Sequence, residues 1–242
     1  MRAGFRPGFD VPGPLLPPGW RPDRDAAPDD ARPERRWSVV DLDGRLRLGD
    51  GTAVLLRPFR SRDGGLLVEG FERLSPLSRY RRFLAPVPRL TESMLAFLTS
   101  VDGVDHRAWG ALVDQRAGAA STGTGGGAPA GVVRWVRTKD DGRVADVAVT
   151  VIDDFQGRGL GGLLLDVAVL DAAAYGVDRF EGVVLGENVA SRRMLARAGA
   201  TLRPEGGGVL AFRLPLPPRV DVLRRSALRA LVAPAERRPR SA

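Results

Sequence analysis

Apolar residues recur along the chain with two spacings, one typical of helices and one typical of strands. From Ser61 to Val101 they return every three or four positions, in three runs that follow the helix-capping residue types at Ser61, Ser75 and Thr91. Elsewhere, short apolar runs separated by turn residues predict strands. The expected strands lie at 52–59, 108–114, 131–138, 143–152, 180–185 and 208–216, with a further short strand or hairpin within 37–50.

Two more helices are expected in the second half of the chain, one after residue 159 and one over 189–198. The first has a single apolar stripe, which consists of Leu163, Val167, Leu170 and Ala174. Asp141-Gly142 predicts a tight hairpin before the strand at 143–152, and the helix after that strand predicts a parallel crossover. Antiparallel hairpins followed by one β-α-β unit predict an α/β (α+β mixed-sheet) fold.

The composition changes at both ends of this pattern. Residues 1–36 are rich in Pro, Arg, Asp and Gly and contain few apolar residues, which predicts a disordered tail. Residues 217–242 form a basic C-terminal tail. A stretch of small residues predicts a flexible Gly-rich insertion over 117–129, between two hairpin strands. We therefore expect a single folded domain over 37–216.

Residue usage excludes several kinds of chemistry. The chain has no cysteine and one histidine, His106, which argues against disulfides, thiol catalysis, zinc sites and Ser-His-Asp catalysis, so we expect no metal. The longest apolar run, 160–170, contains Asp166 and is too short to span a bilayer. The N-terminus lacks the apolar stretch of a signal peptide. A cytoplasmic protein without a membrane partner is therefore expected.

The formal net charge of +8 rests almost wholly on arginine. Such a balance suits anionic ligands, including phosphorylated cofactors and nucleic acid. Many of the arginines lie within 20–36 and 219–240, which favours solvated charge in the tails. Nucleic-acid binding is therefore not expected.

The sequence FQGRGLGG, residues 155–162, lies between an expected strand and an expected helix, which is typical of a phosphate-binding loop. Its glycines satisfy the dinucleotide pattern G-x-G-x-x-G, and Glu181 lies about 20 residues on, near where a ribose-binding acid is expected. The same letters also contain Q-x-x-G-x-G, starting at Gln156. The two patterns imply different cofactors.

The position of the loop decides against a dinucleotide. The dinucleotide fold has its glycines in the first β-α turn, almost directly after the strand, whereas this loop follows at least three expected strands. Only about 85 residues remain after it, too few for the further β-α-β units of that fold. A nucleotide-hydrolysing P-loop is also excluded, because the chain contains no G-x-x-x-x-G-K-[ST].

Three segments resemble a known family. VAVTVIDDFQGRGLGGLLL (147–165) resembles motif A of the GNAT acetyltransferases, and ENVASRRMLARAGA (187–200) resembles the second motif of that superfamily. Upstream, LSPLSRYRRFL (74–84) is similar to the acetyltransferase domain of bacterial Pat-type protein lysine acetyltransferases. The resemblance covers about residues 52–214. It implies the GNAT fold, with a mostly antiparallel central sheet, one splayed β-α-β unit and flanking helices.

The resemblance also implies acetyl-CoA as the acyl donor, with its pyrophosphate in the glycine loop at the positive end of the following helix. The residues implied to bind it are Val149, Thr150 and Val151 through their main chain, together with Gln156, Gly157, Arg158, Gly159, Leu160, Gly161, Gly162, Asn188 and Ser191. For Arg158 a solvated side chain, and for Asn188 a helix cap, are equally consistent with the sequence. The acceptor implied is a protein lysine, on a partner such as an acyl-CoA synthetase, reacting by direct attack in a ternary complex. A small-molecule amine acceptor, or a non-catalytic acyl-CoA-sensing module, remains an alternative.

An amine acceptor must lose a proton, because a lysine side chain has a pKa near 10.4 in water. Pat-type domains have a glutamate as the expected base on the strand before the glycine loop, and Asp146 stands at that position here. A solvated, outward-facing Asp146 is the alternative. The other candidate bases are Glu69, Glu72 and Glu92. Leu195 stands where many GNAT enzymes have a tyrosine that protonates the leaving thiolate.

Two further features are interpreted as surface features. His106 follows two acids in an expected loop. The basic cluster RYRRF, residues 79–83, is interpreted as a solvated helix face, with a contact to the 3′-phosphate of CoA or to an acidic partner as the alternative.

Overall fold

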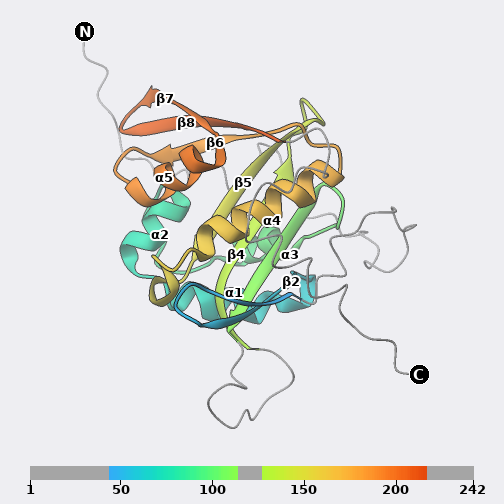
Figure 1. Ribbon diagram of the computed structural model, residues 1–242, viewed down its shortest axis with the longest axis vertical. Helices are drawn as coiled ribbons and strands as arrows, with labels where there is room; N and C mark the ends of the chain where they lie inside the picture. Colours follow the sequence, from blue (N-terminus) through green and yellow to red (C-terminus); the bar gives the residue numbers. More distant parts are fainter. Residues whose placement is uncertain (1–43, 114–126, 217–242) are drawn as a thin grey trace.

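The computed structural model describes residues 44–113 and 127–216, and an eight-stranded sheet forms its centre (Figure 1). The strands are β1 (Gly44–Arg47), β2 (Ala53–Pro58), β3 (His106–Val113), β4 (Ala128–Arg137), β5 (Val144–Val151), β6 (Arg179–Leu185), β7 (Thr201–Gly206) and β8 (Val209–Pro215). Their order in the sheet is β1-β2-β3-β4-β5-β6-β8-β7. All neighbouring strands are antiparallel except β5 and β6, which confirms the expected mixed sheet.

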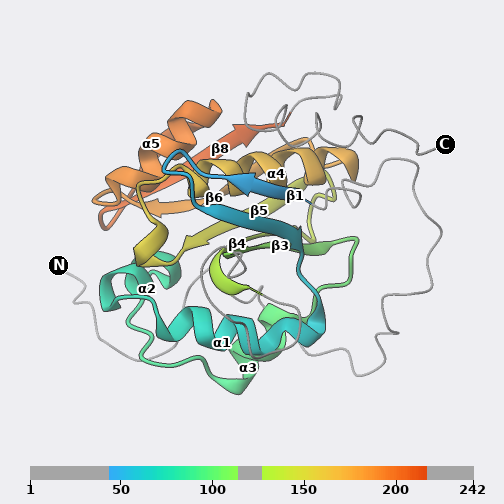
Figure 2. The same cartoon turned by 60° about the horizontal axis from the view of Figure 1, so that its bottom comes forward.

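Helices cover both faces of the sheet. The helices are α1 (Gly64–Glu72), α2 (Pro76–Phe83), α3 (Glu92–Thr99), α4 (Leu160–Ala174) and α5 (Val189–Ala198). Figure 2 shows α1, α2 and α3 together on one face and α4, which connects β5 to β6, on the other. Ser75 and Thr91 cap α2 and α3 as expected, because their side chains accept the N–H groups of Ser78 and Met94.

The side chains of β4 divide between these two faces. Val133 and Trp135 are buried in the core under α4, whereas Val132 packs with Phe59 and Leu67 on the side of α1 and α3. Since side chains alternate along a strand, Arg134 belongs to the α1–α3 side. This mostly apolar strand therefore has one arginine, Arg134, under the helices.

Helix α4 differs from its expected single stripe. Buried residues occur on all its sides, from Leu160 through Leu164 and Ala168 to Ala172. The physical reason is that α4 packs against β3, β4, β5 and α5, so apolar residues are needed all round the helix. Asp171 also lies in this core, where its carboxylate accepts hydrogen bonds from Arg107 and Trp135.

Several expected element bounds need correction. Strand β4 begins at Ala128, so the end of the predicted insertion 117–129 belongs to the sheet. Strand β7 was not predicted, because TLRPEG is mostly polar and contains a proline; it is an exposed edge strand paired with β8 alone. The predictions for 1–36, 217–242 and the main part of the insertion lie outside the described residues.

None of the helices in the described residues has the length and hydrophobicity that crossing a membrane requires. Within the same residues, no group of three or more His, Asp or Glu side chains could hold a metal ion.

Candidate active site

The site begins where strands β5 and β6 separate. The two strands pair in parallel over three positions only, Val144 to Asp146 of β5 with Arg179 to Glu181 of β6. Beyond Asp146, β5 continues to pair with β4 as far as Val151, and β6 pairs with β8 as far as Leu185. In the described part of the chain, the β6 side of β5 therefore has no strand partner from Val147 to Val151. This is the splayed β-α-β unit that the resemblance implied.

Asp146 lies at this fork, at the last paired position of β5. Its neighbours Ala145 and Val147 belong to the core under α4, so the alternation of the strand directs Asp146 away from that core. The carboxylate lies against Gly182 of β6, where a Cβ atom would come within 2.8 Å of Asp146 Oδ1. Glycine at position 182 thus provides the space that the carboxylate occupies.

The environment of Asp146 changes its acidity. Burial raises the pKa of the carboxyl group to about 6, against opposing effects of the Arg82 guanidinium and of a hydrogen bond from the Val147 N–H. An aspartate with a pKa near 6 is mostly ionised at neutral pH and is a stronger base than a solvated aspartate. Asp146 therefore has the protonation state and basicity that a general base needs.

The other candidate bases lie elsewhere. Glu69 and Glu72 of α1 and Glu92 at the start of α3 are exposed. They are solvated helix residues. Among these candidate bases, Asp146 is the one whose pKa is raised by burial.

The glycine loop presents an open surface at the N-terminus of α4. Gly157 and Gly159 have φ values of 74° and 88°, in the left-handed region that favours glycine. A Cβ atom at position 157, 159 or 162 would meet no atom within 4 Å. The first N–H groups of α4 lack partners within the helix, as at any helix start. Free N–H groups, an open surface and the positive end of a helix fit a pyrophosphate.

Residues before the glycines hold the loop against α2. The Asp153 carboxylate accepts hydrogen bonds from the Ser75 and Ser78 hydroxyl groups at 2.7 and 2.9 Å. Burial alone would raise the pKa of Asp153, but the hydrogen bonds from Ser75 and Ser78 outweigh it and the pKa lies below its usual range. Gln156 Nε2 donates to the Val151 carbonyl oxygen at 3.0 Å and to Ser78 Oγ at 3.2 Å. The structure thus gives Gln156 a role in fixing the loop, and its direct contact with a cofactor stays a prediction.

Arg158 is exposed, as one interpretation of the sequence expected, and it is also paired. Its Nη1 donates to Asp50 Oδ2 at 2.6 Å, and its guanidinium lies over the Phe155 ring at 5.4 Å. A phosphate group would have to compete with Asp50 for this side chain, so cofactor binding by Arg158 stays a prediction.

The second motif forms the start of α5. Asn188 Oδ1 accepts the Ser191 N–H at 3.2 Å, so Asn188 caps the helix as the alternative interpretation expected. Leu195 is an apolar residue buried in the main core. It therefore cannot protonate a leaving thiolate as a tyrosine at this position would. Contacts of Asn188 and Ser191 with a cofactor stay predictions.

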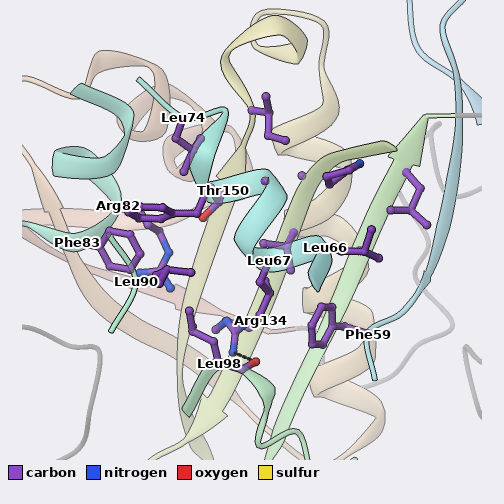
Figure 3. Close-up of a pocket in the computed structure, with 18 of the residues that line it drawn as sticks. Phe59, Leu66, Leu67, Leu74, Arg82, Phe83, Leu90, Leu98, Arg134 and Thr150 are labelled. Atoms are coloured by element: carbon purple, nitrogen blue, oxygen red, sulfur yellow. Dashed lines mark hydrogen bonds between the residues drawn. The ribbon is translucent and has the colours of Figure 1, made fainter. Parts of the chain in front are cut away.

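One surface interpretation from the sequence is wrong, and a second holds in part. His106 is the first residue of β3 and is buried, and its Nε2 lies 2.9 Å from Arg134 Nη1. In the RYRRF cluster, Arg82 is half-buried and lines a partly open cavity (Figure 3), whereas Arg81 forms an exposed ion pair with Glu187. Helix α2 is short and half covered, so one of its arginines must lie inward.

Comparison with known proteins identifies the family. Over residues 53–201 the chain matches the family described as the acetyltransferase (GNAT) domain. The chain belongs to the GNAT acetyltransferase family. GNAT enzymes transfer an acetyl group from acetyl-CoA. The family that the three sequence segments indicated is therefore confirmed.

Two characterised relatives are similar to this GNAT chain. Acetyltransferase Pat of Mycolicibacterium smegmatis is 34% identical over 177 residues, which are 72% of this chain and 49% of Pat. Acetyltransferase PA5475 of Pseudomonas aeruginosa is 30% identical over 63% of this chain and 77% of that protein. The chain thus spans about half the length of the first of these relatives.

Solved structures show the same fold. The GNAT domain of S. lividans PAT is 30% identical, with a TM-score of 0.63, over 72% of this chain and 97% of that domain. YncA of Salmonella typhimurium, solved with acetyl-CoA, is 16% identical with a TM-score of 0.53 over 69% of this chain and 95% of that one, and shares the fold alone.

Proposed function

We propose that this GNAT protein transfers an acetyl group from acetyl-CoA to a primary amine, and that the amine is a protein lysine side chain. The fork between β5 and β6 carries the proposal, because it leaves β5 main-chain groups without a strand partner directly beside a half-buried carboxylate of raised pKa. Acetyl-CoA supplies an activated thioester when it is bound. The chain has no cysteine that could carry the acetyl group, which favours direct transfer in a ternary complex.

Each part of the site has a chemical task in this proposal. The N–H groups at the start of α4 bind the pyrophosphate, and those main-chain groups of Val149 to Val151 that β4 and Gln156 leave free hold the pantetheine arm. The Asp146 carboxylate accepts the proton from the acceptor ammonium, directly or through one water, and so generates the neutral amine. The neutral amine then attacks the thioester carbonyl carbon, a C–N bond forms as the C–S bond breaks, and the leaving thiolate takes up the proton that the amine nitrogen loses.

The charge around the site favours a protein acceptor over a polycationic small amine. The cavity next to Arg82 is lined by apolar side chains and three arginines, and no carboxylate lines it. A polyamine or an aminoglycoside needs acidic partners for its several positive charges. A single lysine, whose other contacts lie outside the site, has no such requirement. A partner such as an acyl-CoA synthetase fits this acceptor class.

An acceptor panel tests the proposal. The full chain is incubated with radiolabelled acetyl-CoA and, in separate reactions, with candidate proteins, polyamines and aminoglycosides. We expect label on lysine side chains of a protein and none on the small amines. If only a small amine is labelled, the acceptor is a small-molecule amine and not a protein lysine. If acetyl-CoA binds but no acceptor is labelled, the non-catalytic acyl-CoA-sensing module is favoured instead.

The cofactor assignment predicts the effect of a charge at Gly159. Substitution Gly159→Glu places a negative charge in the open space at the N-terminus of α4, so we expect CoA affinity to fall about tenfold or more, equivalent to about 1.4 kcal/mol. Isothermal titration with CoA measures this loss. Gly159→Ala is the matched control, because it introduces the same backbone strain without a charge. If the two variants bind CoA with equal affinity, the assignment of the pyrophosphate to this loop is wrong.

A further inference from the structure

A cavity lies between α1–α3 and the sheet, beside the fork, and Thr150 of β5 is among the residues that line it (Figure 3). Phe59, Leu66, Leu67 and Leu98 are among the apolar side chains that line it. About 80 Å³ of it is open to water-sized molecules, several times the roughly 10–15 Å³ that one buried water needs. Asp146 does not line the cavity.

Arg134 enters this cavity from the middle of β4 and is only 4% exposed. Its Nη1 donates to the Leu98 carbonyl oxygen at 3.0 Å and to His106 Nε2 at 2.9 Å. Its Nη2 is buried and has no hydrogen-bond partner. A buried donor without a partner costs about 1–3 kcal/mol, and more when it belongs to a charged group. The guanidinium therefore has one free donor group in an apolar space.

The partners of Arg134 do not neutralise its charge. Burial, and then the neighbouring Arg134, lower the pKa of His106 to about 3, so its ring is neutral and accepts the arginine N–H. The Leu98 carbonyl is neutral as well. In the described residues, no ion pair joins Arg134 to a carboxylate.

A second arginine lies beside Arg134 in this cavity. Arg82 reaches the same cavity from α2, with its guanidinium over the Phe83 ring at 5.1 Å. Burial, and then the charge of Arg82, lower the pKa of Arg134 to about 9, so the two guanidinium groups lie close enough to repel each other. The third arginine of the cavity, Arg57, is already paired with Asp63 at 2.6 Å. The half-buried Arg82 has an anion nearby, because the Asp146 carboxylate favours its charged form. The uncompensated buried charge is therefore that of Arg134, and such a charge is stable only with a compensating anion.

We propose that this cavity binds a small organic carboxylate, whose carboxylate group is held by Arg134 and Arg82 and whose apolar body packs against Phe59, Leu67 and Leu98. A planar carboxylate matches the planar donor groups of arginine, and one oxygen would satisfy the free Nη2. The apolar side chains that line the cavity can pack against the hydrocarbon part of such a ligand. They offer a phosphate group few hydrogen-bond donors beyond the arginines. The glycine loop, which has many N–H groups, lies at another place in the fold.

Binding to the full chain tests the proposal with hexanoate as the probe. We expect saturable binding of one hexanoate per chain by isothermal titration, a rise in Tm with hexanoate, and at least tenfold weaker binding to 1-hexanol and to inorganic phosphate. Arg134→Met is expected to weaken hexanoate binding at least tenfold and to abolish the Tm shift. Arg81→Met is the matched control, because Arg81 lies on the same helix as Arg82 but pairs with the exposed Glu187, and its hexanoate affinity should equal that of the wild type.

Three outcomes would overturn the proposal. They are no saturable hexanoate binding, unchanged hexanoate affinity in Arg134→Met, and equal or tighter binding of hexanol or phosphate. If Arg134→Met does not fold, Arg82→Met provides the same comparison. The measurement requires no acetyl transfer, so its result is independent of the proposed enzymatic function.

Discussion

Substitution Asp146→Asn is expected to lower kcat by a factor of about 10²–10⁴, the usual contribution of a general base. Asparagine has nearly the shape of aspartate and fits the same space beside Gly182, but it cannot accept the proton of an ammonium group. CoA affinity should stay within twofold of the wild type, because the glycine loop is a separate part of the site. Steady-state kinetics on the acceptor from the panel, with CoA titration as the binding control, measure both quantities.

The pH dependence gives a second test of the same role. Wild-type kcat/KM should fall about tenfold per pH unit below the pKa of Asp146, which is about 6. The Asp146→Asn variant should lack this acidic limb. Asp146→Glu keeps a carboxylate and should retain a measurable limb with a shifted midpoint. An Asn variant with wild-type kcat and the same acidic limb would assign the base to another group.

The raised pKa also predicts a stability difference with a definite sign. Folding raises the pKa of Asp146 from 3.8 to about 6, so the folded state holds this proton more tightly than the unfolded state. Wild-type stability relative to Asp146→Asn should therefore decline as the pH rises from about 4 to 6, by at most about 3 kcal/mol at 1.36 kcal/mol per pKa unit. Urea unfolding of both proteins at pH 4 and pH 7 measures the difference. Above pH 6 the variant should have the reduced kcat but be no less stable than the wild type, which separates loss of the base from loss of the fold.

The sequence predicted the elements that carry strong local patterns. Helices α2 and α3 have a capping residue and an apolar repeat, and the glycine loop has a motif that requires left-handed backbone at Gly157 and Gly159. Strand β7 lacks such a pattern, because an exposed edge strand needs few apolar residues. The sequence thus predicts an element only where caps, apolar repeats or glycines within that element determine its conformation.

The cavity could not be predicted in the same way. Arg134 and His106 are 28 positions apart in the chain, and Arg134 and the Leu98 carbonyl are 36 apart. Their contacts depend on how β3, β4 and α3 pack together. The spacing of apolar residues along the sequence does not predict this packing. One signal was present in the sequence: Arg134 interrupts the apolar run GVVRWVRT, where a buried charge needs a partner. The same argument applies to the two buried aspartates of α4, Asp166 and Asp171.

Asp171 gives the largest expected effect on stability. Its side chain is 1% exposed, and its carboxylate accepts two hydrogen bonds from Arg107 at 2.8 Å and one from Trp135 Nε1 at 2.8 Å. Asp171→Ala removes the anion that faces a buried guanidinium and leaves the indole N–H without this acceptor. Breaking a buried pair in this way costs about 3–5 kcal/mol. Since domains are typically stable by about 5–15 kcal/mol, the variant should be only marginally folded.

Urea unfolding, with Asp178→Ala as the matched control, measures this effect. Asp178 pairs with Arg143, but both side chains are largely exposed, so its loss should change the free energy of unfolding by less than about 1 kcal/mol. Replacing both partners, Arg107→Met with Asp171→Leu, should recover most of the stability, because the penalty arises from an unbalanced buried charge and not from the loss of attraction itself. Equal effects of Asp171→Ala and Asp178→Ala, or a double variant as unstable as Asp171→Ala, would show that this ion pair does not control the stability of the core under α4.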